Sequence, residues 1–293
     1  MGYLSNKKHP AFIKTNLNIF LFFSLIITFI SFFQNDFCTL LSEYRAQLYI
    51  LLTIAFFYTI FKKMYLLAFI FFILSTVNFF TISSTNNFFS SQTPTPSNNI
   101  LLGSKQNSVT PLLKQISVYN PDIVAITNSN LQKFEIQDII PDNYTVAAND
   151  DNLQNFIITR LPIKQSGHIN LGFGTKAPFA QVGENDRLTT YIAVDFSGFS
   201  LSKINAMLKK ISFFITQQDN PVVVFGNFNT VSWSYTLSSF IAENNLSVKN
   251  AFFDNIRNLF LPPHYYILGY NEGNFSGNII MPYLNSFSKF TRF

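Results

Sequence analysis

Three long apolar runs in the first third of the chain restrict its fold more than any other feature of the sequence. The runs are Asn16–Phe33, Leu48–Phe61 and Met64–Ile82, and none of them contains a charged residue. A helix needs about 20 apolar residues to cross a bilayer, and basic residues at its ends can lengthen a short run by snorkelling. Helices of this composition are apolar on every face, unlike the surface helices of soluble proteins. We therefore expect residues 1–82 to form a membrane anchor with three transmembrane helices.

The lysines around these runs predict the orientation of the anchor. They precede the first run or separate the second from the third, at Lys7, Lys8, Lys14, Lys62 and Lys63. Lys and Arg are enriched in cytoplasmic loops, so three spans place the rest of the chain on the opposite side. A secretory signal peptide is the alternative for the first run, but no small-x-small cleavage site follows Phe33. We expect an integral protein of a bacterial inner membrane whose C-terminal domain lies on the periplasmic or extracytoplasmic side.

The charge balance of the C-terminal domain disfavours a nucleic-acid partner. Six of the 20 Lys and Arg residues, and two of the 15 Asp and Glu residues, lie in the first 81 positions. The remaining chain therefore holds 14 basic residues against 13 acidic ones. A protein that follows a phosphate backbone normally carries a clear basic surplus. The expected partners are the lipid bilayer and an unidentified envelope ligand or protein.

After the anchor, the pattern changes to that of a mixed α/β domain. Residues 83–99 are rich in Ser, Thr, Asn and Pro, which predicts a polar linker, and residues 100–293 form the domain. The predicted strands are ILLGS from Ile100, PDIVAITN from Pro121, FIITRLPI from Phe156, SGHINLG from Ser166 and RLTTYIAVDF from Arg187. The predicted helices begin after Thr110 as N-cap with Pro111, at Leu131 (LQKFEIQDII), after Ser200 and at Tyr235. In the helix after Ser200, apolar residues recur at helical spacing, at Ile204, Leu208, Ile211 and Ile215.

The stretch PVVVFGNFNTVSW, Pro221 to Trp233, is the strongest candidate for a functional site. Four apolar residues predict a buried strand, and we expect Gly226 to let the backbone turn at the end of that strand. The turn would present Asn227 and Asn229 to a cleft. Trp233 then either lies beside that cleft or packs under the sheet.

Five stretches of the domain carry a resemblance to the endonuclease/exonuclease/phosphatase superfamily, whose members cleave phosphate esters with Mg²⁺. GNFNTVSWS resembles the family's G-D-F-N-x-x-P-W-S, PDIVAITN resembles P-D-I-V-A-L-Q-E, and FIITRLPI resembles a strand ending in S-R-x-P-I. LPPHYYIL resembles P-I-D-H-I-L, and SGNIIMPY resembles G-S-D-H-x-P-V. LLSEYRAQLY, Leu40 to Tyr49, is similar to a motif of bacterial members with three membrane helices. The resemblance implies a four-layer α/β sandwich behind a membrane anchor.

Most of the positions that match the family's site are changed in this chain. These positions are Asn128, Asn227, Asn229, His264, Ile279 and Ile280, of which Asn229 and His264 keep the family's residue. Asn128 replaces a metal-binding Glu and Asn227 replaces an Asp, while the isoleucines replace a catalytic Asp-His pair. A neutral amide cannot take a proton at neutral pH, and Mg²⁺ sites usually contain one or two carboxylates. We therefore expect no intact catalytic residue and no cofactor.

Three interpretations of the function are compatible with the sequence. The first is a pseudoenzyme that serves as an envelope-facing binding or scaffold module. The second is a phosphodiesterase or phosphatase dependent on Mg²⁺ or Mn²⁺, with rearranged ligands. The third is a remnant without a selected function. A bound metal in the cleft would favour the enzyme, whereas an apolar cleft without metal would favour the binding module.

Other ionisable residues of the domain have weaker claims to a functional role. We expect His168 to be part of a surface strand, and His264 lacks the Asp partner that fixes its tautomer in the family. Asp150 and Asp151 are interpreted as a solvated loop pair. Asp195, at the end of a predicted strand, is the residue that could restore a carboxylate to the site.

Overall fold

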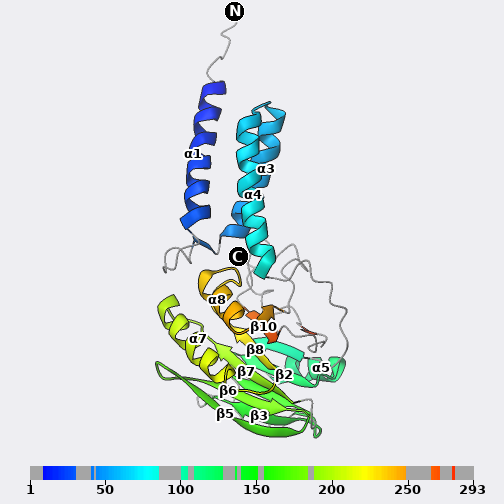
Figure 1. Cartoon of the computed structure of the whole chain (residues 1–293). Coiled ribbons are helices and arrows are strands. Elements are labelled where there is room, and N and C mark those ends of the chain that lie inside the picture. The colour runs from blue at the N-terminus through cyan, green and yellow to red at the C-terminus, as the bar shows by residue number, and fades with distance from the viewer. Residues whose placement is uncertain are drawn as a thin grey trace, which may run out of the picture.

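The computed structural model divides into a helical part and an α/β part (Figure 1). It describes residues 9–30, 41–42, 44–85, 100–104, 109–127, 136, 140–150, 155–183, 188–248, 265–270 and 279–280. Of the positions that match the family site, Asn128 and His264 lie outside these residues.

The helical part contains α1 (His9–Ile30), α3 (Arg45–Phe61) and α4 (Tyr65–Thr85). One segment, Tyr65–Ser83 of α4, is long and apolar enough to cross a membrane, while α1 and α3 contain shorter apolar stretches. The third of the three expected spans is therefore found as a candidate, and the other two stay predictions. Helix α4 also continues to Thr85, three residues into the segment predicted as linker.

Eleven strands of the described chain form two sheets. The first sheet has the order β11-β1-β2-β4-β3, and the second has the order β5-β6-β7-β8-β10-β9. In the first sheet the strands are β1 (Ile100–Ser104), β2 (Ile123–Thr127), β3 (Thr145–Asn149), β4 (Phe156–Thr159) and β11 (Ile279–Ile280). In the second they are β5 (Ile163–Gly172), β6 (Thr175–Val182), β7 (Thr189–Asp195), β8 (Val222–Asn227), β9 (Leu246–Val248) and β10 (Tyr265–Tyr270).

Three clusters of buried side chains show that the domain has four layers. One cluster joins the facing sides of the two sheets and includes Ile123, Ile157, Tyr191 and Phe225. A second packs the outer side of the second sheet against α7 (Leu201–Ile215) and α8 (Tyr235–Glu243). A third covers the outer side of the first sheet with residues that include Ile116 of α5 (Val109–Tyr119). The expected α/β class and the helix-sheet-sheet-helix layering are therefore confirmed.

Most predicted elements of the domain are present, with small shifts at their ends. The amphipathic helix is α7, and all four of its predicted apolar residues are buried. Helix α5 begins at Val109, so Thr110 lies inside its first turn instead of capping it. Pro111 is tolerated there because the first amides of a helix have no partner within the helix. In the segment LQKFEIQDII, Ile140 donates its amide to the Ile136 carbonyl at 3.0 Å, as in a helical turn, and most of that segment lies outside the described residues.

The predicted strand FIITRLPI is in fact two strands that belong to different sheets. Strand β4 ends at Thr159 and β5 begins at Ile163. Between them, Arg160 forms an ion pair of 2.6 Å with Asp122, which fixes the point where the chain leaves the first sheet. Pro162 has no amide hydrogen for a sheet ladder, which favours a break at this position. The apolar pattern of the segment could not reveal this change of sheet, because both halves are β-prone.

The Arg160–Asp122 pair lies beside a buried tyrosine. The Tyr144 hydroxyl donates a hydrogen bond of 2.5 Å to the Pro121 carbonyl, just before β2. Burial raises the pKa of Tyr144, and the positive charge of Arg160 partly opposes this shift. This corner ties the start of β2 to the starts of β3 and β5.

Asp150 differs from its predicted environment. Its side chain is 6% exposed and accepts a hydrogen bond of 2.7 Å from the Asn155 amide. The Asp150 amide in turn donates to the Asn155 carbonyl at 3.1 Å. Asp150 is therefore a buried residue that closes the connection between β3 and β4. The interpretation of Asp150 as a solvated loop residue is wrong, since the residue is buried and bonded to Asn155. Asp151 lies outside the described residues.

Gly226 is required by a close approach of two strands and not by the turn expected from the sequence. It lies inside β8 with a φ of +135°, and β8 continues to Asn227. A Cβ atom at this position would lie 1.9 Å from the Val194 carbonyl oxygen on β7. Only glycine permits this approach, because any side chain would collide with the backbone of the neighbouring strand.

We predict that Gly226→Ala destabilises the domain by about 4 kcal/mol or more, because β7 and β8 must separate to accommodate the methyl group. Gly198→Ala is the matched control, since Gly198 also has a positive φ, of +76°, but a Cβ atom there would have no other atom within 4 Å. Its expected loss is about 1–2 kcal/mol, from the left-handed backbone alone. Urea unfolding of the detergent-solubilised chain measures both values. Equal losses of stability in the two variants would show that the collision with the Val194 carbonyl is not the cause of the destabilisation.

Candidate functional site

The candidate site lies where β7 and β8 end side by side. The two strands are parallel, and Asp195 pairs with Asn227 at the last position of each. Each strand is followed by a turn that contains further polar residues, Ser197 after β7 and Asn229 after β8. The pairing thus gathers one carboxylate, one hydroxyl and two amides from segments about 30 residues apart in the chain.

The Asn227 side chain uses both ends of its amide within this cluster. Its Nδ2 donates to Asp195 Oδ1 at 3.2 Å and to Ser197 Oγ at 3.1 Å. Its Oδ1 accepts the backbone amide of Asn229 at 2.9 Å. The residue is only 6% exposed. An Asp at this position could not donate to Asp195, so the amide is the side chain that this arrangement requires.

Asp195 accepts hydrogen bonds from the turn that follows β7. The Ser197 amide donates to Oδ1 at 3.0 Å, and the Ser197 hydroxyl donates to the same oxygen. Together with Asn227, three donors therefore point at one carboxylate oxygen. Donors that point at the charged form stabilise a carboxylate, so this cluster accommodates one negative charge and orients it.

Asn229 holds the turn after β8. Its backbone is left-handed, with a φ of +50°, a conformation that Asn adopts more readily than most residues. Its Nδ2 donates to the Phe199 carbonyl at 3.4 Å. Asn229 therefore connects the turns that follow the two strands, and its side-chain nitrogen faces backbone within the domain.

We call the ends of β7 and β8 that carry these residues the site edge. The first sheet reaches the site edge through Thr127, the last residue of β2. The Thr127 methyl would lie 3.1 Å from a Cβ on Gly226, so β2 and β8 are in close contact here. Asn128 follows Thr127 directly, and His264 directly precedes Tyr265, which pairs with Asn227. The described neighbours of Asn128 and His264 thus belong to the site edge, while the roles of these two residues stay predictions.

Ile279 and Ile280 are placed differently. They form β11, which pairs in parallel with Ile100 and Leu101 at the start of β1. Strand β1 reaches the site edge only at Ser104, which pairs with Thr127. At about 3.3 Å per residue, the backbone of Ile279 and Ile280 lies roughly 10–13 Å before that edge, because these residues pair with the first two residues of β1. The structure therefore does not gather the two isoleucines with Asn227 and Asn229.

The described donors of this edge do not by themselves form a divalent-cation site. Within the part of the chain that the structure describes, no three His, Cys, Asp or Glu side chains come together. The site edge has one described carboxylate, Asp195, and the Asn227 oxygen already accepts an amide hydrogen. A Mg²⁺ or Ca²⁺ site needs several free oxygen ligands. His168 is also remote, since it lies exposed on β5, the edge strand of the second sheet, and contacts the Asn149 carbonyl.

Trp233 packs against the helical part of the chain. The residue is 3% exposed, and its indole nitrogen donates to the Ser42 carbonyl at 2.7 Å. It forms a buried cluster with Val231, Ala46 and Ile82. Of the two expectations for this residue, burial is confirmed, but its partners are the ends of α3 and α4 and not the underside of the sheet. We call this cluster the anchor contact.

The anchor contact could not be identified from the sequence, because its bonded residues, Ser42 and Trp233, are 191 positions apart. The available signal was that LLSEYRAQLY and GNFNTVSWS belong to the same family resemblance. Ser197 was also missed, since a single serine after a strand has no distinctive pattern.

Comparisons with known proteins are limited to structural likeness. No family model and no curated protein matches this chain. A functionally unknown conserved protein from Enterococcus faecalis has a TM-score of 0.46 and 11% identity, with 58% of this chain and 86% of that chain covered. An endonuclease/exonuclease/phosphatase family protein from Bacteroides thetaiotaomicron has a TM-score of 0.44 and 12% identity, covering 61% and 83%. A beta-hairpin deletion mutant of beta toxin from Staphylococcus aureus has a TM-score of 0.44 and 13% identity, covering 64% of this chain and 92% of that chain. Because these TM-scores are below 0.5, the fold assignment rests on the sheets and core alone.

We predict that Asn227→Asp destabilises the protein at neutral pH and that acid relieves the loss. The new carboxylate faces Asp195, so one carboxyl of the pair titrates above the ordinary range. Repulsion is then fully present above that raised pKa and is lost as the pH falls through it. The free energy of unfolding falls by about 1.4 kcal/mol for every tenfold increase in the proton affinity of that carboxyl. Thermal unfolding at pH 8 and pH 5, followed by Trp233 fluorescence and referred to the wild type at each pH, measures the effect.

Asn227→Ala is the control for this experiment, because it removes the same hydrogen bonds without adding charge. Its loss relative to the wild type should be similar at both pH values. A loss in Asn227→Asp that is equally independent of pH would contradict the predicted carboxylate pair.

Proposed function

We propose that this chain is a membrane-anchored member of the endonuclease/exonuclease/phosphatase superfamily that binds a ligand or partner in the envelope without hydrolysing phosphate esters. Two features support the superfamily assignment: the order of the five motif stretches along the sequence, and the two facing sheets between outer helices. The same two-sheet domain in active members carries a hydrolase site, so the fold alone supports a hydrolase-like domain.

The observation that carries the non-catalytic proposal is the bonding of Asn227. Its amide donates to Asp195 and Ser197 and accepts from Asn229, so the side chain at the family's Asp position is a neutral member of a structural hydrogen-bond network. A general base needs a pKa near the working pH, and a side-chain amide does not take up a proton in that range. The cleft of the superfamily would then serve as a binding surface.

The enzyme alternative is favoured by one observation, the position of Asp195. It pairs with Asn227 across β7 and β8, so a carboxylate does stand at the site edge, one strand away from the family position. A phosphodiesterase or phosphatase with rearranged Mg²⁺ or Mn²⁺ ligands would build its site around this residue.

We predict that the purified full-length chain cleaves neither bis-p-nitrophenyl phosphate nor p-nitrophenyl phosphate in Mg²⁺ or Mn²⁺. Loss of acid-base help removes about 10²- to 10⁴-fold in rate, and loss of metal removes several kcal/mol more. Asn227→Asp combined with Asn128→Glu should not restore turnover, because neither substitution supplies a His facing the phosphate. Release of p-nitrophenol is the measurement. Metal-dependent cleavage by the wild type that Asn229→Ala abolishes would instead support the enzyme.

The proposed location is the inner membrane, with the domain on the periplasmic side. It rests on the lysine distribution and on three spans, of which α4 is the described candidate. A reporter that is active only in the cytoplasm should be silent when fused after Phe293 and active when inserted between Phe61 and Met64. The opposite pattern, or activity at both positions, would overturn the three-span topology.

A further inference from the structure

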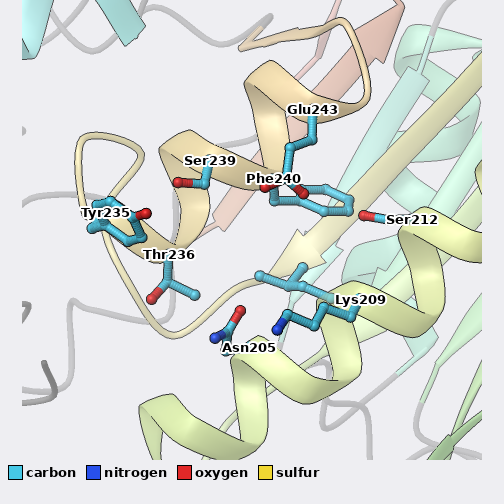
Figure 2. A pocket seen from close by; sticks show the side chains of 9 residues that line it. Asn205, Lys209, Ser212, Tyr235, Thr236, Ser239, Phe240 and Glu243 are labelled. Carbon is cyan, nitrogen blue, oxygen red and sulfur yellow. The ribbon is translucent and has the colours of Figure 1, made fainter. Parts of the chain in front are cut away.

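A polar groove runs between α7 and α8 on the outer face of the second sheet (Figure 2). Asn205 and Lys209 line it from α7, and Tyr235, Thr236, Ser239 and Glu243 line it from α8. Its volume is about 140 Å³, roughly ten times the ~10–15 Å³ that one water molecule needs. The groove, which we call the α7–α8 groove, can therefore hold a small group with several polar atoms.

One end of the α7–α8 groove lies next to the anchor contact. Tyr235 and Thr236 begin α8, two and three residues after Trp233, whose indole is bonded to Ser42 at the start of the α3–α4 hairpin. Figure 1 shows α8 directly below the ends of the membrane helices. Asn205 faces this same end of the groove, whereas Glu243 lies at the far end (Figure 2). A bilayer crossed by α4 therefore has its surface near the Tyr235 end.

The polar groups of the groove have unused hydrogen-bonding capacity. Lys209 is exposed and forms no ion pair with any described residue, including Glu243 across the groove. In the described chain, the side chains of Asn205, Tyr235 and Ser239 likewise have no hydrogen-bond partner. Helix α7 carries three lysines and no acidic residue, so the α7 side of the groove is positive, whereas Glu243 puts one negative charge on the α8 side. Lys209 lies beside Asn205, while the Glu243 carboxylate lies at the other end of the groove (Figure 2). At the Asn205 end, one cation among neutral donors matches a single negative charge that is flanked by hydrogen-bonding groups.

We propose that the α7–α8 groove binds the phosphodiester headgroup of an anionic phospholipid in the leaflet where α4 ends. Lys209 forms an ion pair with the phosphate. The polar headgroup forms hydrogen bonds with the Asn205 amide and with the hydroxyls of Ser239 and Thr236. Tyr235, 38% exposed, lies at the interface, where amphipathic aromatic side chains are favoured. The proposal rests on the membrane anchoring proposed above. It adds a lipid site outside the sheet edge that contains Asn227.

The test uses the full-length chain in dodecyl maltoside, with bound lipids counted by native mass spectrometry. Dioleoylphosphatidylglycerol is the probe, and dioleoylphosphatidylcholine is the zwitterionic control. The variants are Lys209→Gln and, as matched control, Lys210→Gln, whose side chain is also exposed but does not line the groove. We expect Lys209→Gln to weaken one phosphatidylglycerol site about tenfold, or ~1.4 kcal/mol, and Lys210→Gln to leave it within about twofold.

A second variant, Ser239→Ala, removes one donor and should weaken the same site by a smaller factor while leaving phosphatidylcholine retention unchanged. Equal effects of Lys209→Gln and Lys210→Gln would overturn the proposal, because they indicate charge attraction without a defined site. Inorganic phosphate that binds as tightly as the lipid would also overturn it, since the ligand source would then be a free anion. If the reporters give the predicted topology but lipid binding does not depend on Lys209, the lipid site in the groove is refuted. The proposed membrane anchor would not be affected by that result.

Discussion

The contact between the backbones of β7 and β8 at Gly226 is the constraint on which the rest of the candidate site depends. Because Gly226 has no side chain, β8 can approach the Val194 carbonyl and also touch Thr127 of the first sheet. That approach brings Asp195 beside Asn227 and fixes the start of both following turns. The glycine that the sequence suggests as a turn residue is therefore the residue that lets the two sheets meet at the site edge.

The site edge is organised around one negative charge and two amides. Asp195 is satisfied by Ser197 and Asn227, and the oxygen of Asn227 is satisfied by the Asn229 amide. A second carboxylate at position 227 would remove a donor and add repulsion in the same place. The Asn227 amide and the hydrogen bonds around it are thus mutually consistent.

The anchor contact joins helices α3 and α4 to the same loop that carries Asn229. Val231 and Trp233 are buried against Ala46 and Ile82, and the indole hydrogen bond to Ser42 fixes the register of the two parts. Buried aromatic side chains contribute large apolar areas, and the bonded indole avoids an unsatisfied donor. The site edge, the start of α8 and the ends of α3 and α4 therefore form one continuous region near the expected membrane surface.

The sequence by itself determined the mixed α/β class, the amphipathic face of α7, the buried strand β8 and the apolar character of α4, because these follow from local periodicity and composition. It also indicated Asn227 and Asn229 as neighbours at a strand end. Tertiary structure alone decided that FIITRLPI divides between two sheets, that Asp150 is buried, that Asp195 faces Asn227, and that Trp233 packs on the anchor. Strands β3, β6 and β9 were not predicted either, since their segments lack a clear alternation. Each of these outcomes depends on contacts between segments far apart in the chain, and local patterns carry no information on which distant segment a residue will meet.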